Sequence, residues 1–177
     1  RHWEFDGMSC VCSNKVSSNI PAVIELMLQS EMHRDWFLHD LERLVIPALK
    51  EDKLLVMYDY GDVKEKAHKE AWPTGLFSYA FLNKEQEAGY KDGSKKLTPD
   101  IWSNGPDDGM LYVIDFIAPY NNALKVGRFV QKVLTERYIE SYPLDGANFI
   151  RQALGKRLGY ATGVQSELDV RRYCCAV

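Results

Sequence analysis

The stretch Leu111–Tyr120, LYVIDFIAPY, decides the fold class of this chain. It is an almost continuous run of β-branched, aromatic and other apolar residues, and Pro119 stops it. Such a run predicts a central strand that is buried on both faces of a sheet. Asp115 breaks the pattern, because a carboxylate inside a core is costly unless it is paired or hydrogen-bonded. We therefore expect a partner for Asp115, and the best candidate segment lies far upstream, at residues 29–36.

The segments around this strand alternate between helical and extended patterns. Apolar residues at helical spacing predict helices over residues 20–30, 38–49 and 122–140, with Pro47 ending or kinking the second of them. Further strands are predicted over 53–58 and 74–82, a short acidic helix over 84–90, and loops over 60–71 and 91–109. This order predicts an α/β layer arrangement with a largely antiparallel sheet.

Composition narrows the class of protein. A chain of 177 residues with 46% hydrophobic and 27% charged residues predicts one globular domain, here 19–177, after an irregular arm over 1–18. The net charge of −3 gives no overall attraction for nucleic acid, and no apolar run reaches the length of a membrane span. The four cysteines lie near the two ends, which favours reduced cytoplasmic thiols, and their spacing is not a standard zinc pattern.

Three polar residues could carry proton-transfer chemistry. His33 is a candidate general base, because histidine titrates near neutral pH, and Asp115 could orient it. Spacing alone leaves a plain helix-end role open for His33 and a structural hydrogen-bonding role open for Asp115. Ser30 lies three residues before His33, on the same face if the segment is helical. It could be a nucleophile or a polar group near a reacting carbonyl, or simply a serine at a helix C-terminus.

Five motifs follow one another in a defined order: HRDW at 33–36, IPAL at 46–49, SYA at 78–80, Glu85 with Glu87, and IDFIAP at 114–119. In this order they resemble the toxin-activating lysine acyltransferases, which attach fatty acyl chains to lysines of RTX (repeats-in-toxin) protoxins. The resemblance runs from about Ser30 to Lys132. It departs from the family pattern at Tyr79, where members often carry Trp, at Leu44, and over 60–71, which looks inserted.

The resemblance implies a fold and a reaction. The fold would be acetyltransferase-like (GNAT), with a central, mostly antiparallel mixed sheet flanked by helices. The protein would be a bacterial, cytoplasmic protein-lysine fatty acyltransferase and a homodimer, with no bound cofactor or metal. His33 would be the catalytic base, Asp115 its partner and Ser30 a secondary member of the site. Arg34 and Trp36 would keep the site residues in place. Arg34 would pair with a carboxylate, and Trp36 would pack in the core or line the acyl pocket.

The sequence that follows Pro119 bears on the identity of the acyl donor. Acetyl-CoA-dependent relatives carry a glycine-rich loop that holds the pyrophosphate at a helix N-terminus, and Tyr120–Gly127 does not match it. The resemblance implies acyl carrier protein as donor, and a stripe of Lys125, Arg128 and Lys132 would suit this acidic partner. A solvated helix face fits the stripe equally well. Two alternatives stay open: an acetyl-CoA-dependent N-acetyltransferase, and a non-catalytic binding module in which His33 and Asp115 do not meet.

Overall fold

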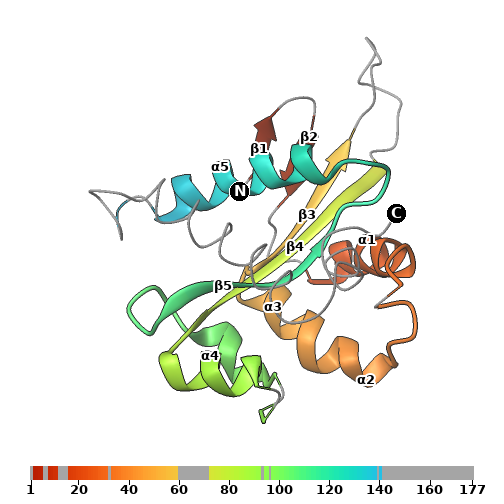
Figure 1. The fold of residues 1–177 in the computed structure, drawn as a ribbon. Coiled ribbons are helices and arrows are strands. Elements are labelled where there is room, and N and C mark those ends of the chain that lie inside the picture. The colour runs from red at the N-terminus through yellow and green to blue at the C-terminus, as the bar shows by residue number, and fades with distance from the viewer. Residues whose placement is uncertain are drawn as a thin grey trace.

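The computed structural model describes residues 2–5, 8–11, 16–31, 33–59, 72–92, 94–95, 97–138 and 140, with side chains from Asn19 onward except that of Lys91. Its strands form one antiparallel sheet in the order β1-β2-β3-β4-β5 (Figure 1). They are β1 (His2–Phe5), β2 (Met8–Val11), β3 (Leu54–Asp59), β4 (Trp72–Leu82) and β5 (Met110–Ile117). The helices are α1 (Val16–Leu28), α2 (Leu38–Asp40), α3 (Ile46–Lys50), α4 (Lys84–Lys91) and α5 (Ala123–Tyr138), with a π turn η1 (Leu41–Val45) and a 3-10 turn η2 (Pro99–Ser103).

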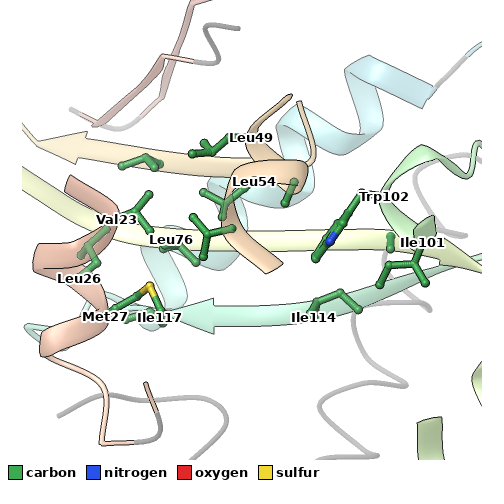
Figure 2. Close-up of a cluster of buried hydrophobic side chains, with 14 of the residues drawn as sticks. Val23, Leu26, Met27, Leu49, Leu54, Leu76, Ile101, Trp102, Ile114 and Ile117 are labelled. Atoms are coloured by element: carbon green, nitrogen blue, oxygen red, sulfur yellow. The ribbon is translucent and has the colours of Figure 1, made fainter. Parts of the chain in front are cut away.

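Two hydrophobic cores lie on opposite faces of this sheet. On one face, α5 packs its buried residues Val126, Phe129, Val130, Val133 and Leu134 against β3, β4 and β5. On the other face, α1, α3 and η2 cover the sheet, and Figure 2 shows this second core. Gly75 in β4 allows the close approach of α5, because a Cβ there would lie 2.7 Å from the Val126 side chain. The layered α/β architecture predicted from the sequence is confirmed, and every strand pairing described is antiparallel.

Within the described part of the chain, the Asp115 strand does not have the central position that was predicted for it. Among the described strands β5 lies at the end of the sheet, and β4, between β3 and β5, is buried from Pro73 to Leu82. The reason is that β5 contacts both cores although it has one described neighbour. Leu111 and Phe116 face the α5 side, whereas Tyr112 and Ile117 face the α1 side. Apolar residues on both faces therefore do not require a central position.

The irregular arm predicted for residues 1–18 was also wrong. His2–Phe5 and Met8–Val11 pair with each other, and the second strand continues the sheet along β3. Residues 16–18 already belong to α1. The pairing uses backbone hydrogen bonds, which need no hydrophobic alternation, so the mixed composition of this segment concealed two strands. The predicted loop over 60–71 lies outside the described residues.

The predicted helix over 38–49 is present but irregular. Pro47 has no N–H to donate, and its ring would clash with the carbonyl four residues earlier. The backbone before Pro47 forms the wider π turn of η1, in which the Ile46 N–H donates to the Leu41 carbonyl. Pro47 then sits in the first turn of α3, where a missing N–H costs little. Within the described part of the chain, no helix combines the length and the apolarity needed to cross a membrane.

Candidate active site

His33 is carried by a short turn that follows α1. The turn is closed by backbone hydrogen bonds from the N–H of His33 (3.0 Å) and the N–H of Arg34 (2.9 Å) to the Ser30 carbonyl. Both Ser30 and His33 are buried, with 4% and 5% of their surfaces exposed. The turn therefore holds the two side chains against the α1 face of the sheet.

A chain of hydrogen bonds joins three of the predicted residues. His33 Nε2 lies 2.9 Å from Asp115 Oδ1, and His33 Nδ1 lies 2.6 Å from Ser30 Oγ. The expected partner of Asp115 is thus His33, across 82 positions of sequence. This contact disagrees with the binding-module alternative, which predicted that the two side chains lie apart.

If Asp115 is ionised, the hydrogen-bond chain favours one tautomer of the imidazole. An ionised Asp115 only accepts hydrogen bonds, so Nε2 carries the proton that faces it. In the neutral ring, Nδ1 then presents its lone pair, and the Ser30 hydroxyl donates to it. The order serine, histidine, aspartate is that of a general base oriented by a carboxylate. His33 Nδ1 can accept a proton from Ser30, or from a substrate group that takes the place of Ser30.

A β-bulge aims Asp115 at His33. Ser78 pairs with Asp115, but the next residue, Tyr79, pairs with Val113, so Ile114 is an extra residue in β5. Side chains alternate between the faces of a strand, and one extra residue reverses that alternation. Ile114 and Asp115 therefore both face the α1 side, where His33 lies. Without the bulge, Asp115 and Ile114 would occupy opposite faces.

The other residues predicted for the site have different surroundings. The Trp36 ring lies 4.8 Å from the His33 ring, centroid to centroid, and packs against the α1-side core. Arg34 is half exposed and pairs at 3.7 Å with the exposed Glu31, so its carboxylate partner lies at the surface. Among the described contacts, none joins Arg34 to His33 or Asp115.

The basic stripe on α5 is not uniform. Lys125 Nζ lies 3.2 Å from Asp59 Oδ2 at the end of β3, and the pair is only partly exposed. Arg128 and Lys132 are exposed on the same helix. One member of the predicted docking stripe therefore already has a carboxylate partner within the fold.

Sequence reasoning missed the role of Ser78 in this site. Its hydroxyl donates to Asp115 Oδ2 (2.8 Å) and accepts from the Asp115 N–H (3.0 Å). The sequence contained a signal, because Ser78 is a polar residue inside the apolar run of β4 and belongs to the SYA motif. The motif supported the resemblance, but no partner was assigned to its serine.

Two groups of buried ionisable side chains lie outside the site. Burial raises the pKa of Tyr79 well above its ordinary value, and burial also raises the pKa of Tyr138, whose hydroxyl is 2.7 Å away. Burial lowers the pKa of Lys53, whose ammonium donates to the carbonyls of Trp102 and Asn104. These contacts join secondary-structure elements and do not reach His33.

Comparison with known proteins decides the family. The family model of the RTX toxin acyltransferases, HlyC, matches residues 13–152, which include both cores and the hydrogen-bonded site. The chain belongs to the RTX toxin acyltransferase family. The resemblance stated from its motifs is thereby confirmed.

Individual members of the family are similar over part of their length. The leukotoxin-activating lysine-acyltransferase LktC, serotype A1, of Mannheimia haemolytica is 27% identical over 67% of this chain and 58% of its own. The RTX-II toxin-activating lysine-acyltransferase ApxIIC of Actinobacillus pleuropneumoniae is 33% identical over 55% of this chain and 53% of its own. The protein-lysine myristoyltransferase RtxC of Kingella kingae is 22% identical over 74% of this chain and 71% of its own. The chain thus spans little more than half the length of the first two relatives.

Proposed function

We propose that this family member is a protein-lysine fatty acyltransferase that transfers an acyl chain from acyl carrier protein to lysines of an RTX-type protoxin. The observation that carries the proposal is the buried hydrogen-bond chain from Ser30 through His33 to Asp115. A hydrogen-bonded histidine–carboxylate pair in a member of this family supports a catalytic role over a purely binding role.

The reaction requires removal of two protons from the lysine ammonium. The first is released to water, because the nitrogen must be a neutral amine before it can attack the thioester carbonyl carbon. His33 accepts the second proton through Nδ1 as the nitrogen attacks, and Asp115 stabilises the resulting imidazolium through Nε2. Collapse of the tetrahedral intermediate breaks the C–S bond, and the proton on His33 passes to the departing phosphopantetheine thiolate. The products are an amide on the lysine, the free carrier thiol and one proton in solution.

The first prediction concerns the base. His33→Ala should remain folded and lose transfer by about 10²–10⁴-fold, the usual contribution of a general base, and Asp115→Asn should be nearly as damaging. His39→Ala is the matched control, because His39 is an exposed histidine outside the site. Transfer is measured by mass spectrometry of a candidate protoxin incubated with acylated carrier protein. Near-normal acylation by folded His33→Ala would remove histidine from the mechanism.

The same assay distinguishes the proposed acyltransferase from the alternative enzyme. An acetyl-CoA-dependent N-acetyltransferase would modify the acceptor when acetyl-CoA replaces the acylated carrier protein. The sequence Tyr120–Gly127 supports the carrier protein, because it lacks the glycine-rich loop that holds a pyrophosphate. We further propose a homodimer, on the family resemblance, and sedimentation as a monomer at micromolar concentration would contradict it.

A further inference from the structure

Ser78 is the most completely enclosed polar side chain beside the site. It lies in the middle of β4, none of its surface is exposed, and it pairs directly with Asp115 across the sheet. Both described hydrogen bonds of its hydroxyl go to that one residue. The hydroxyl donates to Asp115 Oδ2 at 2.8 Å and accepts the Asp115 N–H at 3.0 Å.

These two contacts offset the disturbance that the bulge introduces. The extra residue Ile114 interrupts the ladder, and a bulge leaves backbone groups without their regular partners. The Ser78 hydroxyl accepts the Asp115 N–H in place of a carbonyl. Because the same hydroxyl donates to Oδ2, the carboxylate is held at one oxygen, and the other oxygen, Oδ1, faces His33.

We propose that Ser78 is a positioning residue for the acyl-transfer site, which holds the Asp115 carboxylate and thereby fixes the tautomer of His33. With Oδ1 aimed at Nε2, the proton stays on Nε2 and the Nδ1 lone pair faces Ser30. If the hydroxyl is removed, the carboxylate can rotate and the preference between the two tautomers is lost. The kinetic part of this inference rests on the proposed function, whereas the tautomer part does not.

The chain offers a matched control on the same strand. Thr74 is a buried hydroxyl residue of β4 at 6% exposure, but its hydroxyl bonds to the Met57 carbonyl and not to Asp115. Thr74→Val removes a strand hydroxyl without touching the site. Ser78→Thr keeps the hydroxyl and adds a methyl group, so it tests whether the hydrogen bonds can be rescued.

The test compares Ser78→Ala, Ser78→Thr and Thr74→Val by nitrogen NMR of histidine-labelled protein. The His33 signals are identified by their absence from His33→Ala. Native protein and Thr74→Val should show the single Nε2–H tautomer, Ser78→Ala a mixture of both, and Ser78→Thr a return toward the native form. A native tautomer in Ser78→Ala overturns the proposal. If Ser78→Ala does not fold, Ser78→Cys, with a weaker donor of similar size, takes its place under the same criterion.

Kinetics give a second readout. Ser78→Ala should lower kcat by about tenfold to a hundredfold, the loss expected for one hydrogen bond to a charged group, with KM unchanged. Thr74→Val should retain the native kcat. A rise in KM with native kcat would overturn the positioning role. If no acyl transfer is found in any variant, the proposed function fails, and the NMR comparison still decides whether Ser78 positions Asp115.

Discussion

At the residue scale, Ser30 and the lysine of the proposed reaction would need the same lone pair, the one on His33 Nδ1. Asp115 occupies Nε2, and Ser30 Oγ lies 2.6 Å from Nδ1. Two routes follow from this geometry. The amine displaces Ser30 and delivers its proton to His33 directly, or His33 activates Ser30, which accepts the acyl group first and passes it on. Both routes use the same three residues, but only the second forms an acyl-serine.

The Ser30→Ala variant tests this competition. We expect its transfer rate to fall by about tenfold or more, because the hydroxyl that holds the neutral ring at Nδ1 is lost and general-base geometry is exacting. Mass spectrometry of the native enzyme, mixed with acylated carrier protein and no acceptor, measures whether an acyl group remains on the enzyme. A native rate in Ser30→Ala would exclude both an obligatory acyl-serine and an orienting role for this hydroxyl.

The sequence predicted which polar residues meet better than it predicted the strand geometry that holds them together. Asp115 needed a partner because it is a carboxylate in an apolar run, and that argument led to the correct segment. The bulge at Ile114 could not be predicted, because the flanking residues are apolar on both faces and the alternation that would reveal a phase change is hidden. The contact between Ser78 and Asp115 depends on this bulge, so it became visible only in three dimensions.

At the scale of elements, a second polar network fastens the end of α5 to the sheet. Arg137 donates to the Tyr79 hydroxyl at 2.7 Å and to the Asp52 carbonyl at 2.5 Å, in the turn between α3 and β3. The hydroxyl oxygens of Tyr79 and Tyr138 lie 2.7 Å apart, so one of these hydroxyls donates to the other. Tyr79 stands where members of the family often have Trp, and the network gives its hydroxyl a structural use.

This network predicts a loss of stability at alkaline pH. Burial raises the pKa values of Tyr79 and Tyr138 above the ordinary 10.0. Above pH 10 the unfolded chain releases these protons while the folded chain keeps them, so the free energy of unfolding falls as pH rises. The contribution of these two protonated tyrosines to the free energy of unfolding is fully present below pH 10. Urea unfolding followed across pH 8 to about pH 11 measures the effect.

The variant for this test is Tyr79→Phe. Below pH 9 it should cost on the order of 1 kcal/mol, because Arg137 loses an acceptor, and above pH 10 its stability should depend less on pH than that of the native protein. Tyr120→Phe is the control, since Tyr120 is 59% exposed. Parallel pH curves for Tyr79→Phe and the native protein would show that the buried hydroxyl does not control the alkaline loss.

Helix periodicity explains which elements could be predicted. Buried positions of α5 recur at helical spacing, and Asn83 with Gln86 forms the cap that starts α4, so both helices matched their predicted ranges closely. β1 and β2 could not be predicted, because β1 pairs with β2 and β2 pairs with β3 through backbone bonds that need no hydrophobic alternation. The order of strands in the sheet depends on contacts between distant segments, which local patterns do not contain.

At the scale of the whole molecule, the net charge of the chain provides no electrostatic attraction for an acidic donor protein. The net charge of −3 would repel an acidic partner weakly, so attraction must come from a local surface. The basic stripe on α5 offers one, but Lys125 is paired with Asp59 at 3.2 Å. Replacing Lys125 would break an ion pair inside the fold as well as any contact with a partner. Arg128, which is exposed on the next turn, is therefore the sharper probe.

The last prediction is that Arg128→Glu slows acylation when acyl carrier protein is the donor. Charges at the rim of an interface act mainly on the association rate and its salt dependence. The variant should therefore raise KM for the acylated carrier protein with little change in kcat, and its rate should depend less on salt than the native rate. Lys84→Glu is the control, because it changes the net charge equally on α4, which lies away from α5 (Figure 1). Equal effects of the two reversals would indicate a response to net charge alone, and a native KM in Arg128→Glu would leave this face of α5 as ordinary solvated surface.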